Sequence, residues 1–145
     1  MPKISAELPQ TIASFITGHT LSSVCFVMPN GSPHCISCFY VLHEKSNTLI
    51  FKSSKGTLHD ELIVSGAPVA GTILTMDKTV FHAKGIQLSG SLLAEKDLST
   101  LQKALYVKAF PLSLGMPGYN WGIVLEKIKF TDNTIKLGHK EHWSA

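Results

Sequence analysis

A long stretch without charge most limits what this chain can fold into. Residues 8–43 contain no Asp, Glu, Lys or Arg. A membrane-spanning helix needs about 20 consecutive apolar residues. No apolar run here is longer than that of residues 24–28, and prolines and glycines interrupt the stretch. The stretch therefore predicts buried elements of a globular domain and no membrane association. The N-terminus lacks the apolar core of a signal peptide, so we expect a cytoplasmic protein.

The composition predicts a single domain over residues 1–145. Hydrophobic residues make up 44% of the chain and charged residues 16%, against about 25% charged in a typical domain. All 13 basic residues are lysines, and they are scattered along the chain. Nucleic-acid-binding proteins cluster their basic charge and favour arginine. We therefore expect no nucleic-acid partner, and we expect a homodimer that covers apolar surface.

Apolar periodicity predicts the secondary structure. The expected elements, in chain order, are a helix around residues 8–18, strands over 21–28, 34–43 and 49–52, a short helix capped by Thr57 with Asp60, strands over 69–74 and 86–93, a helix over 97–110 with Leu101 facing inward, and strands over 121–130 and 134–137. The strands 21–28 and 34–43 are apolar on both faces, so both faces need cover. Six to seven antiparallel strands with about three helices predict a small, mainly β, α+β barrel.

The polar segment 52–57 is the clearest candidate for a binding site. We expect it to join the end of a strand to the start of a helix, where unpaired backbone N–H groups and the helix dipole favour an anion. The hydroxyls of Ser53 and Ser54 and the compact cation of Lys55 add hydrogen bonds and charge. This pattern suits a phosphomonoester. The alternative is an ordinary polar turn.

The three cysteines, Cys25, Cys35 and Cys38, cannot all pair within the chain, which argues against a disulfide framework. A redox CxxC motif opens a helix, but Cys35 and Cys38 fall in a predicted strand, where residues three apart point to opposite faces. We therefore predict buried, structural cysteines. The seven histidines show no metal-binding spacing, so we expect no metal site. Any catalytic chemistry would come from a cofactor.

The order of elements resembles the FMN-binding split β-barrel superfamily, which includes pyridoxamine 5′-phosphate oxidase. The segment 49–55, followed by Leu58, is similar to the third strand and phosphate-binding turn of that superfamily. The segments 70–72, 85–90 and 129–134 resemble, more narrowly, its bacterial YhbP-like branch. The likeness extends over nearly the whole chain.

The resemblance implies FMN at the interface of a homodimer. Carried over by position, the implied cofactor-binding residues are Ser53, Ser54 and Lys55 at the phosphate, Thr57 or His59 nearby, Gln87 at the flavin ring, and Trp121 from the other subunit. Each of these could instead be a barrel-surface residue, and Trp121 a dimer-core aromatic residue. Pyridoxamine 5′-phosphate oxidases depend on arginines, and this chain has none, so we do not expect that activity.

These observations together predict a flavoprotein oxidoreductase. It would transfer electrons between a reduced donor and a small acceptor, and FMN would supply the chemistry. Two alternatives stay open. One is a non-enzymatic module that binds flavin, haem or another planar ligand, and the other is a split-barrel dimer without a cofactor.

Overall fold

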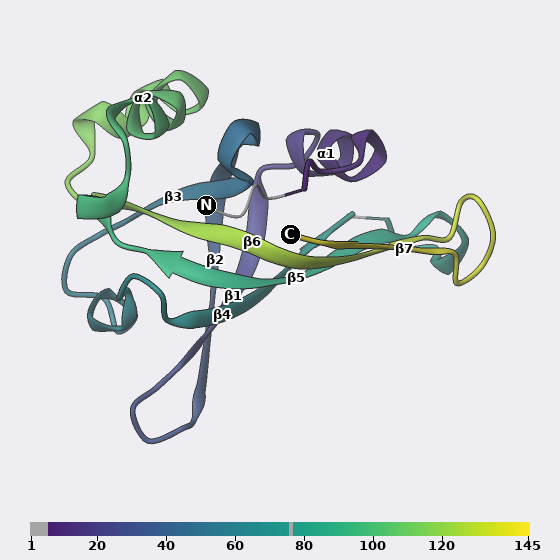
Figure 1. Ribbon diagram of the computed structural model, residues 1–145, viewed down its shortest axis with the longest axis horizontal. Helices are drawn as coiled ribbons and strands as arrows, with labels where there is room; N and C mark the ends of the chain where they lie inside the picture. The colour runs from purple at the N-terminus through teal and green to yellow at the C-terminus, as the bar shows by residue number, and fades with distance from the viewer. Residues whose placement is uncertain (1–5, 76) are drawn as a thin grey trace.

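One antiparallel sheet that closes on itself dominates the computed structural model, which describes residues 6–75 and 77–145 (Figure 1). Its main elements are α1 (Gln10–Thr17), β1 (Leu21–Val27), β2 (Pro33–His43), β3 (Thr48–Ser53), β4 (Pro68–Leu74), β5 (Lys84–Leu93), α2 (Thr100–Ala109), β6 (Tyr119–Asp132) and β7 (Lys140–Ser144). The strand order is β3-β2-β1-β4-β5-β6-β7, and pairing of β3 with β6 closes the first six strands into a barrel. The predicted split barrel is confirmed.

Strand β6 holds the barrel closed because it has three neighbours. Its first half pairs with β3, its second half pairs with β7, and β5 runs beside most of its length. The register between β5 and β6 shifts at Ser89 and Gly90. A Cβ atom on Gly90 would lie 2.1 Å from the carbonyl oxygen of Val124. This close approach of two backbones requires glycine.

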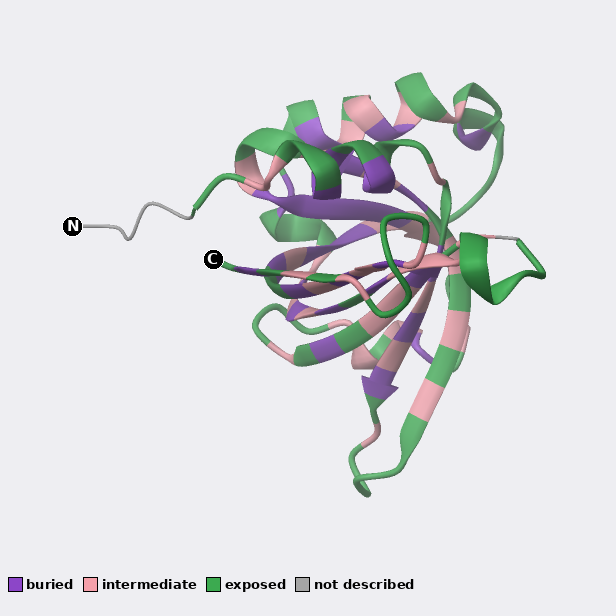
Figure 2. Ribbon diagram, turned by 90° about the vertical axis from the view of Figure 1, so that its right-hand side faces the viewer, coloured by how far each residue is buried: buried purple, intermediate pink, exposed green. Residues whose placement is uncertain are grey.

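Large side chains from several strands fill the barrel. Phe26, Phe51 and Trp121 are buried inside it, and Phe51 stacks on Trp121 with ring centroids 4.4 Å apart. Both helices lie on the same side of the barrel, and the β1–β2 hairpin extends away from them (Figures 1 and 2). The buried Tyr40 hydroxyl donates to the carbonyl oxygen of Ile16 at 2.6 Å, which ties α1 to β2. No helix in the described ranges is long and apolar enough to cross a membrane.

The last strand lies further along the chain than the sequence predicts. Residues 134–137 belong to a turn, and β7 begins at Lys140. The Asp132 carboxylate accepts from the backbone N–H of Thr134 at 2.9 Å, and the Asn133 side chain accepts from the N–H of Gly138 at 2.9 Å. These side-chain bonds compete with strand pairing. They lengthen the connection between β6 and β7.

Two of the predicted helices also differ from the structure. No α-helix begins at Thr57. A one-turn 3₁₀ helix, η2 (Asp60–Leu62), lies at this point of the chain, and it has no side-chain cap. The helix predicted over 97–110 begins at Thr100, because Ser99 and Gln102 form a capping box before it. Leu101 is exposed, and Gln102 and Tyr106 are the buried residues of α2. The predicted count of three helices is therefore too high for the described chain, which has two α-helices.

Candidate functional site

Ser53 is the hub of a small polar network at one end of the barrel. Its hydroxyl accepts a hydrogen bond from the indole N–H of Trp121 at 2.8 Å and lies 2.9 Å from Nε2 of His59. The Thr57 hydroxyl lies 3.3 Å from the same nitrogen. Four of the seven residues that the resemblance implied therefore meet here, although Trp121 is distant in sequence from the other three.

Trp121 belongs to the barrel interior. Its side chain is 0% exposed, and it packs against Phe51 and Phe26. Its indole N–H is used by Ser53. This burial leaves no face for a ligand from another subunit, so the structure favours a packing role, and we leave Trp121 out of the proposed ligand site.

His59 is a buried histidine between the network and a second histidine. Its ring stacks on Phe26 at 5.6 Å and on His34 at 6.5 Å. Burial lowers the pKa of His59 below its ordinary value of about 6.5, and the nearby His34 lowers it further, against an opposing effect of Asp60. The neutral imidazole is therefore the form that the fold favours.

This shift predicts a pH dependence of stability. The unfolded chain takes up a proton on His59 at a higher pH than the folded chain does. The contribution of His59 to the free energy of unfolding is therefore present above about pH 6.5 and is lost as the pH falls below it. Urea unfolding between about pH 7.5 and pH 5 measures this slope. We expect His59→Gln to flatten it and Leu101→Ala, at an exposed position of α2, to leave it unchanged. An equal slope in His59→Gln and wild type would contradict the assignment.

Ser54 and Lys55 lie exposed in the turn between β3 and η2. The expectation of a helix N-terminus at this turn is wrong, since η2 is a single 3₁₀ turn. One backbone donor of the turn is also occupied, because the N–H of Gly56 donates to the Asp60 carboxylate at 3.0 Å. This bond is the first cause of the lowered pKa of Asp60, and the Tyr119 hydroxyl adds to it. Any anion held here would be bound by side chains, without a helix dipole.

Gln87 lies far from this turn within one chain. It is exposed on the outer face of β5 and pairs with Lys129 of β6, whereas Ser53 pairs with Tyr119 of the same strand. Ten residues of β6 separate the two positions, which is about 30 Å of extended strand. The structure does not bring Gln87 together with the phosphate candidates, and we leave it out of the proposed site.

A cavity of about 360 Å³ opens beside Ser53 and Ser54, between the outer face of β2 and β3 and the segment that follows α2. We call it the β3–α2 cavity. Its lining residues are Ser37, Cys38, Phe39, Lys52, Ser53, Ser54, Tyr106, Phe110, Leu112, Ser113, Met116 and Pro117. Its size falls within the range of small-molecule sites, which are mostly apolar with a few polar groups.

The polar groups of the β3–α2 cavity lie on facing segments. The Lys52 ammonium group donates to the carbonyl oxygen of Ser113 at 2.6 Å, which ties β3 to the 3₁₀ helix η5 (Pro111–Gly115). The Ser113 hydroxyl oxygen is buried and has no hydrogen-bond partner among the described residues. A buried hydroxyl without a partner costs about 1–3 kcal/mol. A ligand in the cavity that bonded Ser113 would remove that cost.

Aromatic rings form the apolar side of the cavity. Phe110 lies 5.9 Å from Phe39 and 4.9 Å from Tyr106, measured between ring centroids. The Cys38 thiol donates to the carbonyl oxygen of Lys52 at 3.3 Å, and burial raises its pKa. Neither these rings nor Cys38 was expected from the sequence to line a binding site. The outward position of Phe39 on its strand was a signal, but its partners on α2 and η5 could not be inferred from spacing.

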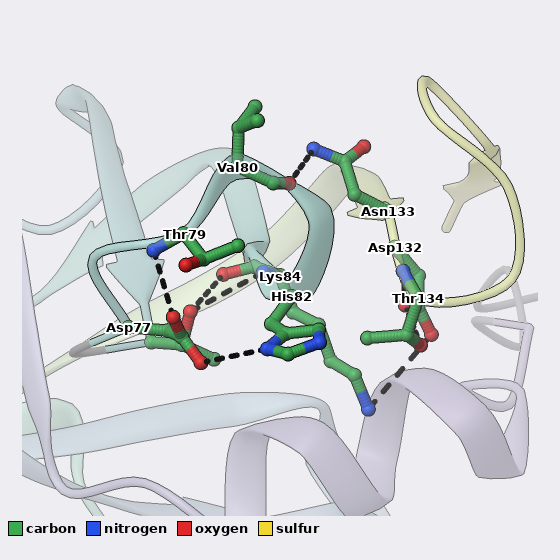
Figure 3. Close-up of polar contacts among 9 residues, drawn as sticks. Asp77, Thr79, Val80, His82, Lys84, Asp132, Asn133 and Thr134 are labelled. Atoms are coloured by element: carbon green, nitrogen blue, oxygen red, sulfur yellow. Dashed lines mark hydrogen bonds and ion pairs between the residues drawn. The ribbon is translucent and has the colours of Figure 1, made fainter.

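A second polar cluster lies at the turn from β6 toward β7 and is shown in Figure 3. Asp77 lies 3.6 Å from His82, and Lys84 lies 3.9 Å from Asp132. Burial of Asp132 opposes its ionisation, but hydrogen bonds from Thr134 and the charge of Lys84 lower its pKa overall. These ion pairs and hydrogen bonds stabilise the loop before β5 and the turn after β6. We find no group of three or more metal-ligating side chains in the described part of the chain.

The closed six-stranded barrel with one extra strand defines a split β-barrel protein. The chain belongs to the UPF0306 family: a UPF0306 protein of Serratia proteamaculans is 32% identical over 142 residues, 97% of each chain. A UPF0306 protein of Yersinia pseudotuberculosis is 36% identical over 111 residues, 76% of each chain. No protein-family model matches the sequence.

Solved structures share the fold at low sequence identity. A haem-binding protein from Mycobacterium smegmatis superposes with a TM-score of 0.74 at 10% identity, covering 96% of this chain and 60% of that one. An FAD-binding protein from the same organism gives 0.64 at 12% identity, covering 97% and 100%. HutZ, the haem storage protein of Vibrio cholerae, gives 0.65 at 14% identity, covering 83% and 92%. At these identities the likeness shows the fold.

Proposed function

We propose that this protein binds FMN in the β3–α2 cavity. The observation that carries the proposal is a cavity with aromatic walls that ends in Ser53, Ser54 and Lys52 and contains the unpartnered Ser113 hydroxyl. An isoalloxazine ring suits the aromatic side, and a phosphate suits the serine and lysine end. The flavin- and haem-binding neighbours support a planar ligand in this fold. The assignment to the YhbP-like branch is part of the same proposal.

The lining of the cavity favours flavin over haem. Histidine is a common axial ligand of haem iron, and the described residues that line the cavity include none. Cys38 is the thiol there, and its raised pKa keeps it protonated, which is unfavourable for binding iron. His34 and His59 pack against the barrel end and do not line the cavity. Haem is the second candidate because two of the structural neighbours are a haem-binding protein and a haem storage protein.

We propose in addition an oxidoreductase activity that would depend on bound FMN. When bound, FMN would supply the chemistry for moving an electron pair between a reduced donor and an acceptor. The chain itself would hold the phosphate with Ser53, Ser54 and Lys52, and would orient the ring against Phe39 and Phe110. No acid or base for the reaction is assigned to this chain.

The proposal includes a homodimer that covers the rim of the β3–α2 cavity. Leu112 is 87% exposed and Met116 is 61% exposed, and both border the cavity beside the exposed Phe39. Clustered exposed apolar side chains are typical of interaction surfaces. We expect wild type to sediment as a dimer at micromolar concentration and Leu112→Asp as a monomer. Leu137→Asp, at an equally apolar exposed position in the turn before β7, should remain a dimer. A monomeric wild type would contradict this part of the proposal.

Titration of the purified protein with FMN, riboflavin and haemin tests the ligand. We expect FMN fluorescence to be quenched at lower concentrations than riboflavin fluorescence, since riboflavin lacks the phosphate. Reduction of the bound flavin by NADPH or NADH would support the oxidoreductase. A haemin Soret shift with no flavin binding would instead favour haem. Failure of all three ligands to bind would leave a split barrel without a cofactor.

A further inference from the structure

Two cysteines face each other across strands β1 and β2. Cys25 is the direct partner of Cys35 in the antiparallel register, so both side chains point to the same face of the sheet. Each lies two residues from the turn-side end of its strand, and the hairpin that β1 and β2 form extends away from the helices (Figures 1 and 2). Both thiols are free, Cys25 is half-buried and Cys35 is exposed.

The hydrogen bonds of the ladder fix the type of this pair. The N–H of Tyr40 donates to the oxygen of its opposite residue Thr20 at 2.9 Å, and the N–H of Met28 donates to that of Ser32 at 2.8 Å. Bonded and non-bonded pairs alternate along an antiparallel ladder. The Cys25–Cys35 pair lies an odd number of steps from both bonded pairs and is therefore non-bonded. Such pairs have Cα atoms about 4.5 Å apart, inside the range of about 4.4–6.8 Å that a disulfide spans.

The surroundings of the pair admit a reagent. Both cysteines line an open groove of about 630 Å³ on the outer face of the sheet. Lys127 and Lys129 also line it, and the described lining residues include no Asp or Glu. This groove shares no lining residue with the β3–α2 cavity. A small disulfide of net negative charge, such as oxidised glutathione, fits the charge of this groove.

We propose that Cys25 and Cys35 form a reversible cross-strand disulfide by exchange with an anionic low-molecular-weight disulfide. The exposed Cys35 attacks one sulfur of the reagent, whose S–S bond breaks and releases one thiol. Cys25 then attacks the Cys35 sulfur of the mixed disulfide and releases the second thiol. The two protein thiols are oxidised by two electrons, the reagent is reduced to two thiols, and the two protons pass to those thiols. The proposal does not depend on flavin binding.

Cys38 takes no part in this exchange. It lies on the opposite face of β2 from Cys35, as the alternation of that strand requires. Its thiol donates a hydrogen bond to the Lys52 carbonyl oxygen in the β3–α2 cavity. The CxxC spacing in the sequence is therefore coincidental, and the residue that pairs with Cys35 comes from the preceding strand. The expectation that Cys35 and Cys38 are buried, structural cysteines is wrong for Cys35, which is exposed.

Intact-protein mass spectrometry after treatment of the reduced full chain with oxidised glutathione tests the proposal. Wild type and Cys38→Ser should each lose two hydrogen atoms, retain no glutathione, and regain the hydrogens with dithiothreitol. Cys25→Ser should stop at one bound glutathione, since the resolving thiol is absent. Circular dichroism of each variant checks that it folds, and Cys25→Ala repeats the test without a new hydroxyl.

Several results would overturn the proposal. A Cys25→Ser protein that still loses two hydrogens would place the bond between Cys35 and Cys38. Wild type that accumulates glutathione adducts, or that stays reduced in excess reagent, would show that the pair does not close. A disulfide-linked dimer on a non-reducing gel would show that the bond forms between chains.

Discussion

Replacement of Trp121 by alanine is expected to lower the free energy of unfolding by about 3–5 kcal/mol. The Trp121 side chain is fully buried and contacts rings from two other strands. Its removal leaves a cavity between Phe51 and Phe26. It also removes the hydrogen bond that the indole N–H donates to the Ser53 hydroxyl. Urea-induced unfolding followed by circular dichroism measures the loss.

The Trp121→Phe variant separates the contribution of ring packing to stability from the contribution of the hydrogen bond. Phenylalanine keeps a ring against Phe51 and loses the N–H, so we expect a cost clearly below that of Trp121→Ala. Leu101→Ala, at an exposed position of α2, serves as a control and should change stability by less than about 0.5 kcal/mol. A cost below about 1 kcal/mol for Trp121→Ala would contradict its place in the core.

Lys52→Met is expected to weaken FMN binding about 10- to 150-fold. Lys52 is half-buried and lines the β3–α2 cavity. Of its three donors, one is used by the Ser113 carbonyl oxygen, which leaves donors for a phosphate. A hydrogen bond to a charged group contributes about 1.5–3 kcal/mol, which corresponds to that loss of affinity. Methionine keeps most of the apolar stem, and fluorescence titration measures the change.

Three comparisons sharpen this test. Lys55→Met should have a smaller effect, because an exposed ion pair contributes about 1 kcal/mol or less. Lys136→Met, in the turn between β6 and β7, should have none. Riboflavin should bind wild type and Lys52→Met about equally, since it carries no phosphate. An unchanged FMN affinity in Lys52→Met would remove the phosphate from this end of the cavity.

The barrel could be predicted because the alternation of side chains between the two faces of a strand can be read from the local sequence. Residues 34–43 alternate between two faces, and the observed β2 alternates in the same way. Ser53 and Ser54 of the predicted anion site line a cavity, but the helix expected behind them is missing. Asp60 accepts a hydrogen bond from the turn instead of contributing to a helix cap. Side-chain bonds of that kind are not visible in an apolar periodicity.

The cavity itself could not be predicted, because its walls are distant in sequence. Lys52 and Ser113 are joined by one hydrogen bond although they are 61 residues apart. The ring of Phe39 on β2 likewise packs against the ring of Phe110, which follows α2 and is distant in sequence. Local propensity places each segment, whereas the packing of α2 on β2 and β3 decides which side chains share a cavity.

The position of β6 has a consequence for how the chain reaches its fold. Closure depends on pairs such as Thr48 with Val124, so the barrel cannot close during synthesis until β6 has left the ribosome. Until then β3 and β5 are open edges of an incomplete sheet, and such edges are prone to pair with other chains. Topologies with so many distant pairings fold slowly, in milliseconds to seconds. The interval before β6 arrives is therefore the period in which this protein is most exposed to aggregation.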